Sequence, residues 1–395
     1  LPSRAPRQRP RNAVPRASAH GGLRQPAAAP QQQRRLEALD GLRALSILVV
    51  LVGHGATSSG APDSMWQLRD LGRLGVYLFF AISGFIITLL MARERQRSGT
   101  LDLRAFWLRR ALRILPPFAA ACGGIAVAAG LGLVRWHWAS FLGALTFTKN
   151  TQLFSGDWFF GHFWSLSLEE QFYLVWPLMF LALLRGHHAL LVLAAMTLAS
   201  PLLMLLSQAT YPLFDNSLPC LPYLALGCLL ALAVHGRHPL LQRWRAHWQL
   251  RRALLCLLPL GALGAGLLVR DGHWFYLDAL VHACVVPAAV AILLSEGVLE
   301  DGLLRRPMSW APLRWVGMIS YSLYLWQQLF LAKPEDYLNP DAFWVQWPQN
   351  LLAAVACGAF SYLLVEKPSA AWKKRLDARA KAIHEKSAAH EKGGV

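Results

Sequence analysis

Hydrophobic residues are gathered along the chain into long runs of about 18 to 22 residues, which short polar segments separate. A helix needs about 20 apolar residues to cross a bilayer, so the pattern predicts an all-α, polytopic membrane bundle of about ten transmembrane helices. We expect the spans at residues 41–58, 73–92, 113–134, 162–184, 189–206, 218–235, 252–270, 277–295, 313–332 and 349–366. A further apolar stretch, 138–148, is too short to span and is expected to be interfacial or re-entrant.

Basic residues occur in alternate loops of this scheme. Arginine and lysine are concentrated after the second, sixth, eighth and tenth predicted spans, whereas the loop after the fifth contains neither. This alternation follows the positive-inside rule and predicts that both termini are cytoplasmic. The net charge of +17 is therefore explained by membrane topology, and no nucleic-acid partner is expected.

Composition supports the same domain organisation. The chain is 55% hydrophobic and only 15% charged, whereas a soluble domain has roughly 25% charged residues. Residues 1–36 are rich in Arg, Pro, Ala and Gln and lack the apolar core of a signal peptide, which indicates a disordered basic arm. We assign 37–370 to the transmembrane domain and 371–395 to a charged cytoplasmic tail. The six cysteines lack metal-ligand spacing, so they are interpreted as buried apolar thiols and no metal site is expected.

Two ionisable residues lie within the first predicted span. Arg43 and His54 are eleven positions apart, which places them on nearly the same helix face, about 16 Å apart along the axis. Because ionisable groups inside a bilayer are expensive, the pair favours a functional site that faces the protein interior. The alternative is an arginine that snorkels to the headgroups and a histidine that packs against another helix.

Glu169 and Glu170 lie near the outer end of the fourth span, at a predicted depth similar to that of His54. A carboxylate that faces an imidazole would fix its tautomer and suit it to act as a general base. Alternatively, one glutamate faces the headgroups while the other stabilises the helix N-terminus.

Arg110 and Arg113 are three residues apart where a basic run meets the third span, so both can point one way from a helical turn. Forked guanidinium groups suit the phosphates of a cytosolic metabolite, although such residues also serve as topology signals. In the second span, Ser83 and Gly84 are expected to permit close helix approach rather than to supply a nucleophile.

The ninth span combines hydroxyl, aromatic and amide side chains at Tyr321, Tyr324 and Gln327. We expect these residues to support the site or to line an outer cavity that suits a sugar ring or another polar acceptor. An interfacial belt of tyrosine and tryptophan would look similar.

Taken in order, these segments resemble the membrane-bound acyltransferase-3 family, bacterial enzymes that O-acylate cell-surface and secreted glycans. The resemblance covers about 39 to 370 and rests on 39–45 with His54, on Gly75-Val76 and 79–85, on Arg110 and Arg113, on 163–173, on 319–326 and on 365–368. Two positions depart from the pattern. Gln327 replaces a histidine that usually follows Leu-Trp, and Tyr77 stands where an aspartate often follows Gly-Val.

The resemblance implies transfer of an acyl group, usually acetyl, from cytosolic acyl-coenzyme A to a hydroxyl of a glycan or a lipid-linked sugar. Acyl-coenzyme A is then a co-substrate rather than a bound cofactor, and the expected location is the bacterial inner membrane. It assigns catalytic roles to Arg43, His54 and Glu169, and acyl-coenzyme A binding to Arg110 and Arg113. The extracytoplasmic hydrolase-like domain that is fused to some members is not expected here.

Residue chemistry and resemblance together predict a mechanism. The phosphates of coenzyme A would bind Arg110 and Arg113, with Arg43 as a deeper anchor, and the thioester would lie near His54. Oriented by Glu169, His54 would deprotonate the acceptor hydroxyl or carry the acyl group itself. Two alternatives stay open: a proton-coupled transporter, and the same chemistry on an antibiotic or another small molecule.

Overall fold

The structure of the chain, a computed structural model, describes residues 29–151, 154, 156–185, 189–199, 217–268 and 281–372. Within these ranges the chain is helical and contains no β-strand, although an isolated bridge joins Val134 to Tyr337. The longer helices are α1 (Ala29–Gly55), α2 (Leu71–Ser98), α3 (Leu103–Gly130), α5 (Phe163–Arg185), α6 (Ala189–Leu198), α8 (Leu221–His235), α10 (Trp248–Leu268), α12 (Val286–Val298), α14 (Ala311–Phe330) and α15 (Gln349–Ser361). Shorter ones are α4 (Trp138–Leu145), α9 (Pro239–Ala246) and α13 (Arg305–Met308).

Each of the ten predicted spans overlaps one of the longer helices. Five described segments are long and apolar enough to cross a membrane: Glu37–Gly55, Asp63–Ser98, Leu103–Gly130, Leu218–His235 and Gln349–Trp372. The chain is therefore a multi-pass membrane protein, while the count of ten spans and the cytoplasmic location of the termini stay predictions. The short apolar stretch after α3 forms α4, whose 8 residues are too few to cross a bilayer.

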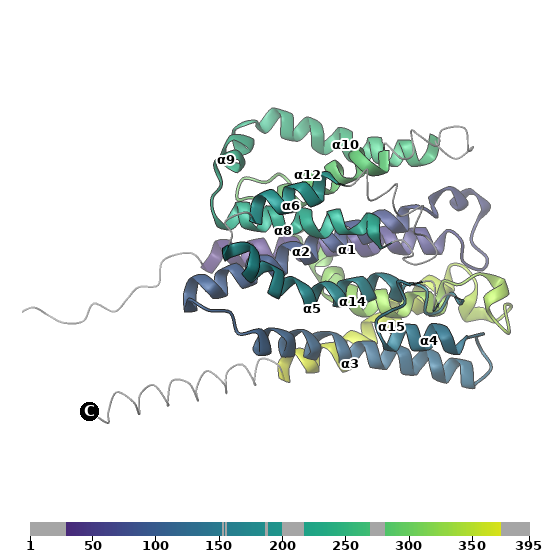
Figure 1. Cartoon of the computed structure of the whole chain (residues 1–395). Helices are drawn as coiled ribbons and strands as arrows, with labels where there is room; N and C mark the ends of the chain where they lie inside the picture. Colours follow the sequence, from purple (N-terminus) through teal and green to yellow (C-terminus); the bar gives the residue numbers. More distant parts are fainter. Residues whose placement is uncertain are drawn as a thin grey trace, which may run out of the picture.

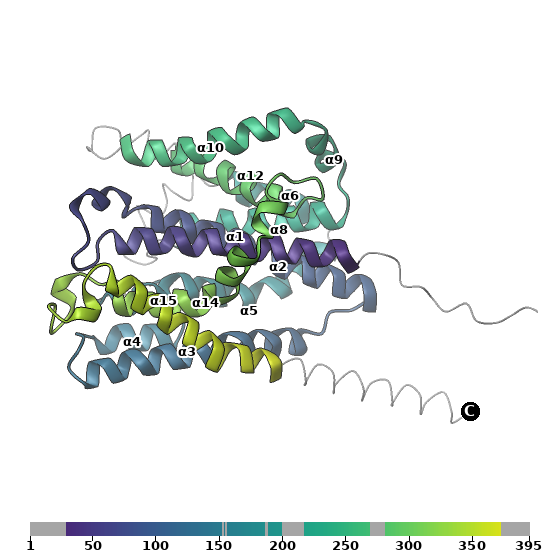
Figure 2. The same cartoon turned by 180° about the vertical axis from the view of Figure 1, so that it is seen from behind.

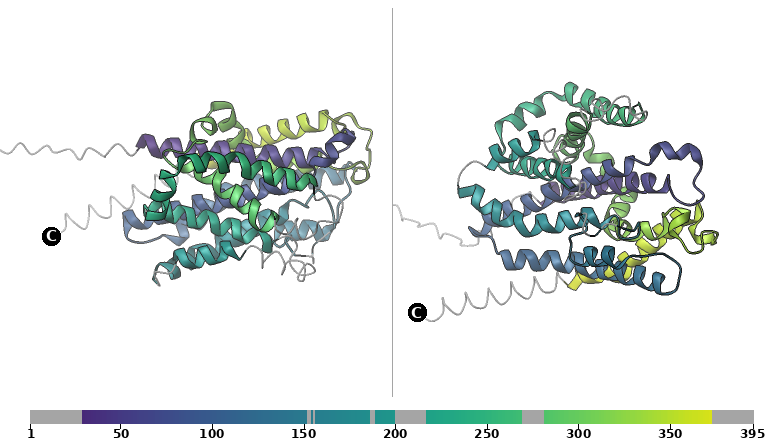
Figure 3. Two further views of the ribbon diagram at one scale, coloured as in Figure 1. Left: turned by 90° about the horizontal axis from the view of Figure 1, so that it is seen from above. Right: turned by 45° about the vertical axis from the view of Figure 1, so that its right-hand side comes forward.

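The helices lie roughly side by side, with α1 and α2 in the middle of the bundle (Figure 1). Helices α8, α6, α12 and α10 lie on one side of this pair, and α5, α14, α15 and α3 lie on the other, as the view from behind also shows (Figure 2). The start of α1 and the end of the helical segment that follows α15 lie at the same end of the bundle, which α9 also occupies. The right-hand view in Figure 3 also has α10 and α3 on opposite sides of α1.

Glycines bring α2 and α8 into close contact. A Cβ atom added to Gly84 would lie 2.3 Å from the carbonyl oxygen of Leu224, and one added to Gly227 would lie 2.1 Å from the carbonyl oxygen of Ala81. No larger residue fits at these positions unless the helices separate, because backbone atoms cannot move aside as a side chain can. The prediction that Gly84 permits close helix approach is confirmed.

Two predicted helix starts differ from the structure by ten residues or more. Helix α1 begins at Ala29 rather than near residue 41, so part of the predicted arm is helical, while 1–28 and most of the tail lie outside the described residues. Helix α3 begins at Leu103 rather than near 113, because Asp102 caps it by accepting a hydrogen bond from the Ala105 amide at 3.0 Å. Most of the lysine- and arginine-free loop after α6 also lies outside the described residues.

Candidate active site

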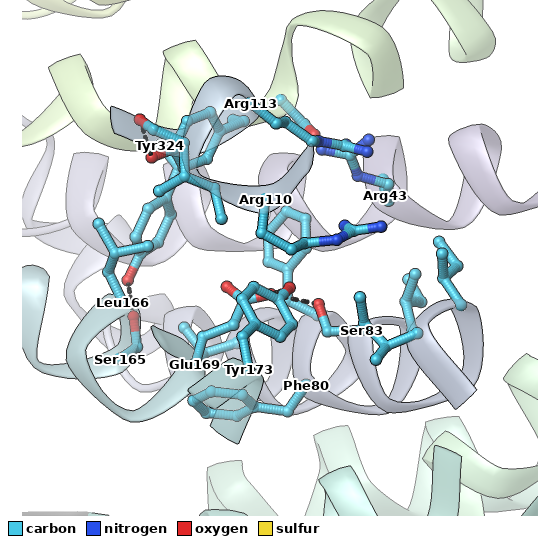
Figure 4. A pocket seen from close by; sticks show the side chains of 18 residues that line it. Arg43, Phe80, Ser83, Arg110, Arg113, Ser165, Leu166, Glu169, Tyr173 and Tyr324 are labelled. Atoms are coloured by element: carbon cyan, nitrogen blue, oxygen red, sulfur yellow. Dashed lines mark hydrogen bonds between the residues drawn. The ribbon is translucent and has the colours of Figure 1, made fainter. Parts of the chain in front are cut away.

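A cavity of about 90 Å³ lies among α1, α2, α3, α5 and α14 (Figure 4). We call it the arginine cavity, because Arg43, Arg110 and Arg113 line it. In Figure 4 the three guanidinium groups lie together on one side of the cavity, and Tyr324 lies with Ser165 on the other. The remaining lining includes polar and aromatic residues of the predicted site, namely Ser83, Glu169, Tyr173, Tyr321 and Tyr324.

The early start of α3 explains how two of these arginines reach the cavity. Arg110 and Arg113 lie seven and ten positions after Leu103, about 10 and 15 Å along the helix. They lie inside the bundle, beside Arg43 of α1, where the basic run leads into the third predicted span.

The three guanidinium groups lack acidic partners at contact distance. Among the described residues none of them forms a hydrogen bond or an ion pair within 4.0 Å, and Nε of Arg110 is buried without a partner. Arg110 instead lies over the rings of Phe106 and Tyr173, with its Cζ atom 5.9 Å and 5.7 Å from their centroids. Uncompensated cations inside a membrane protein are costly, so this arrangement favours an anionic ligand.

Glu169 is the acidic residue that lines this cavity. Its Oε1 atom accepts hydrogen bonds from the hydroxyl groups of Ser83 on α2 and Tyr173 on α5 (Figure 4). The carboxylate is thus held in place beside the arginines. The prediction that Glu169 orients His54 is wrong, because the side chain of Glu169 lines the arginine cavity and His54 has a different partner.

His54 lines a second cavity of about 200 Å³, which we call the histidine cavity. Its lining residues are His54, Arg69, Asp70, Gly72, Arg73, Val76, Gly161, His162, Trp164, Tyr324 and Gln328. Nδ1 of His54 lies 2.8 Å from Oε1 of Gln327, and the imidazole packs edge-on against Trp158 with 5.3 Å between ring centroids. An amide oxygen only accepts, so this contact places the proton on Nδ1 and leaves the lone pair of Nε2 free.

Gln327 therefore has a clear place in the site. It is one of the two positions that depart from the family pattern, in which a histidine is usual there. Gln327 is fully buried on α14 and lines neither cavity, but it contacts His54 directly. An amide can replace an imidazole in this position because either can hold the neighbouring ring in one orientation.

A second histidine, which was not among the predicted site residues, lines the same cavity. His162 precedes α5, and its Nδ1 and Nε2 atoms lie 2.7 Å from Oε1 of Gln328 and 3.1 Å from the carbonyl oxygen of Leu325. Gln328 also accepts a bond from the backbone amide of His162 at 2.9 Å. Adjacent glutamines on α14 thus hold two histidines, and the position of His162 directly before the Phe163–Tyr173 block was the signal available in the sequence.

The structure divides the predicted site residues between the two cavities. Arg43, Arg110, Arg113, Glu169, Ser83 and Tyr321 line the arginine cavity, His54 lines the histidine cavity, and Tyr324 lines both. Tyr321 donates a hydrogen bond to the carbonyl oxygen of Ile114 at 3.1 Å and so ties α14 to α3. Arg43 and His54, which are eleven positions apart on α1, thus line different cavities of the same helical bundle.

Curated proteins of similar sequence carry names that describe O-acetyltransferases. The chain is 26% identical over 382 residues to "Putative peptidoglycan O-acetyltransferase YrhL" of Bacillus subtilis (strain 168), a match that covers 86% of this chain and 55% of that protein. It is 25% identical over 363 residues to O-acetyltransferase OatA of Staphylococcus aureus (strain NCTC 8325 / PS 47), covering 85% of this chain and 57% of that protein. The chain thus spans little more than half the length of these relatives. No solved structure matches it.

The family comparison covers nearly all of the helical bundle. The model of the acyltransferase-3 family, described as an acyltransferase domain, matches residues 36–366. This range contains both cavities and every residue assigned to them above. The chain therefore belongs to the acyltransferase-3 family.

Proposed function

We propose that this protein is a membrane O-acyltransferase that moves an acetyl group from cytosolic acetyl-coenzyme A to a hydroxyl of a cell-envelope glycan. The observation that carries the proposal is the pairing of an arginine-lined cavity with an adjoining cavity that holds a histidine of defined tautomer. The names of YrhL and OatA support acetyl as the acyl group, and the name of YrhL, which mentions peptidoglycan, supports a glycan as the acceptor.

The arginine cavity is the proposed donor site. Arg43, Arg110 and Arg113 would bind phosphate oxygens of coenzyme A, because planar guanidinium groups form paired, charge-assisted hydrogen bonds with such anions. Among the described residues no acidic side chain forms an ion pair with these arginines. Bound phosphates would therefore supply the balancing negative charge. Glu169 would limit the net positive charge of the cavity and keep Ser83 and Tyr173 in position.

The histidine cavity is the proposed acceptor site. It combines hydrogen-bonding groups with the aromatic face of Trp164, a mixture that suits a sugar ring. With its proton on Nδ1, His54 would use Nε2 to take the proton of an acceptor hydroxyl. The hydroxyl oxygen would attack the thioester carbonyl, the C–O bond would form as the C–S bond breaks, and the thiolate of coenzyme A would leave with the proton from Nε2.

A second route uses the same atoms. Nε2 of His54 would attack the thioester first, forming an acyl-imidazole and releasing the coenzyme A thiol, and the acceptor hydroxyl would then take the acyl group. Both routes require His54 and predict the same product. They differ in whether labelled acetyl remains on the protein when no acceptor is present.

Transfer of radiolabel from acetyl-coenzyme A tests the proposed function. Inverted membrane vesicles that contain the protein and a glycan acceptor should label the glycan, whereas vesicles with His54→Ala should not. A protein that transports its substrate would leave the glycan unlabelled and would contradict the proposal. Label on an added small molecule, with none on glycan, would keep the chemistry and overturn the proposed acceptor.

A further inference from the structure

The arginine cavity and the histidine cavity share two lining residues, Val76 of α2 and Tyr324 of α14. The three arginines line only the first cavity, and His54 lines only the second. Val76 and Tyr324 therefore border both the space beside the arginines and the space beside His54. In Figure 4 Tyr324 lies on the side of the arginine cavity opposite to the guanidinium groups.

Tyr324 is held firmly at this boundary. Its hydroxyl lies 2.5 Å from Oγ of Ser165, which lines the arginine cavity, and 3.1 Å from the carbonyl oxygen of His162, which lines the histidine cavity. Oγ of Ser165 also lies 3.1 Å from that carbonyl oxygen, so the three oxygens form a closed triangle. The hydroxyl groups of Ser165 and Tyr324 each donate one hydrogen bond within this triangle, so rotation of either side chain would break at least one hydrogen bond.

Ring contacts fix the same side chain from both cavities. The tyrosine ring packs edge-on against Phe79, which lines the arginine cavity, at 6.2 Å between centroids, and against His162 at 5.3 Å. Val76, the other residue that lines both cavities, is 8% exposed and carries a β-branched side chain with little rotamer freedom. The boundary is therefore formed by two side chains that cannot easily move aside.

We propose that Val76 and Tyr324 form the passage through which the acyl group reaches His54, and that they thereby select the size of the acyl group. The proposal rests on the proposed function of the two cavities. A short acyl chain such as acetyl fits between two fixed side chains more readily than butyryl, whose additional methylene groups need space that a close-packed interior lacks. Val76 and Tyr324 are thus assigned as specificity-determining residues.

The test compares acetyl- and butyryl-coenzyme A as donors for label transfer to one glycan acceptor. Wild-type protein should strongly prefer acetyl. Val76→Ala and Tyr324→Leu should raise kcat/KM for butyryl-coenzyme A relative to that for acetyl-coenzyme A by about tenfold or more. One or two methylene groups in an apolar pocket typically change discrimination between substrates by this amount. Tyr324→Phe retains the ring and should keep a preference closer to that of wild type.

Two further variants sharpen the result. Val76→Phe should block the passage, so that transfer of acetyl falls while acetyl-coenzyme A still binds in the arginine cavity, as measured by equilibrium binding. Val127→Ala makes the same truncation at a residue of α3 that is 62% exposed and lines neither cavity, and it should leave the donor preference unchanged.

The outcomes separate this proposal from the proposed function. If wild-type protein transfers no acyl group to any acceptor, the proposed function fails and the passage fails with it. If wild-type protein transfers acetyl but Val76→Ala keeps the same acetyl-to-butyryl ratio, the passage is overturned while the proposed function stands. Val76→Ala alone decides this point if Tyr324→Leu does not fold.

Discussion

The amide oxygen of Gln327 lies 2.8 Å from Nδ1 of His54, although the two residues are 273 positions apart in the sequence. The contact joins α14 to α1 and places the imidazole proton away from Nε2. It gives His54 the orientation and the tautomer that a general base or a nucleophile needs, a role that the sequence had assigned to Glu169.

Replacement of Gln327 by leucine should release this constraint. We expect kcat for acetyl transfer to fall by about 10- to 100-fold, which corresponds to the loss of one buried hydrogen bond of about 1–3 kcal/mol, while KM for acetyl-coenzyme A changes little. Gln327→Glu retains an accepting oxygen and should keep more activity than Gln327→Leu. Transfer by Gln327→Leu at the wild-type rate would show that His54 needs no partner on α14.

The matched control for this variant is Gln242→Leu. Gln242 is an exposed residue of α9, and its side-chain amide donates a hydrogen bond to the carbonyl oxygen of Arg237 at 3.2 Å. It lines neither the arginine cavity nor the histidine cavity. It should leave kcat and KM unchanged.

Arg110→Ala should weaken donor binding. Charge-assisted hydrogen bonds are worth about 1.5–3 kcal/mol each, so we expect KM for acetyl-coenzyme A to rise by about 10- to 100-fold. Arg110→Lys keeps the charge but loses the planar fork, and it should recover only part of the affinity. Initial rates of label transfer over a range of acetyl-coenzyme A concentrations measure both effects.

Arg104 provides the control on the same helix. It is an exposed residue near the start of α3 and lines neither cavity. Arg104→Ala removes an equal charge from the chain, so a comparable rise in KM would indicate a general electrostatic effect rather than a site at Arg110.

Hydropathy alone located the bundle, because a membrane-spanning helix must be apolar along most of its length. It placed the start of α3 about three turns too late, since the basic residues before the apolar run were interpreted as a surface loop. The N-cap residue Asp102 was the available signal that the helix begins earlier. With the helix starting there, Arg110 and Arg113 belong to α3 rather than to a surface loop.

The rotation of each helix about its own axis cannot be predicted from hydropathy. Whether Glu169 faces His54 or the arginines depends on how α5 packs against α2, where Ser83 binds the carboxylate. Sequence spacing fixes which residues share a face of one helix but not which neighbour that face meets. For the same reason the pairing of Gln327 with His54 was out of reach, because the two residues belong to helices far apart in the sequence.

Close contact between α2 and α8 should be sensitive to one methyl group. Gly84→Ala places a Cβ atom 2.3 Å from the carbonyl oxygen of Leu224, so the helices must separate, at a cost of about 1–3 kcal/mol. Gly123→Ala, on α3, meets no atom within 4 Å and should instead stabilise its helix by about 0.5–1 kcal/mol. Thermal unfolding in detergent measures both. Equal midpoints for the two variants would contradict the close contact.

A buried ion-pair network joins α10 to α12 and to the segment that follows α12. Arg251 is 1% exposed, and its guanidinium group contacts Glu296 at 2.6 Å and Asp301 at 2.6 Å. Arg251→Ala leaves the fully buried Glu296 without its main partner and should lower the unfolding free energy by about 3–5 kcal/mol. Arg252→Ala, at the exposed neighbouring position, should cost far less. Neither variant should alter the acetyl-to-butyryl ratio.

The same network predicts a dependence of stability on pH. Burial alone would raise the pKa of Asp301, but its hydrogen bond with Arg251 and the nearby charge of Arg245 outweigh burial and hold the pKa below its ordinary value. The unfolded chain therefore binds the proton more readily, so the stabilisation is present at neutral pH and is lost as the pH falls below about 4. Asp301→Asn should lower the unfolding midpoint at pH 7 but reduce its fall between about pH 5 and about pH 2. Asp341→Asn, at an exposed residue, should retain the wild-type fall, and an equal fall in all three proteins would show that Asp301 does not couple folding to pH.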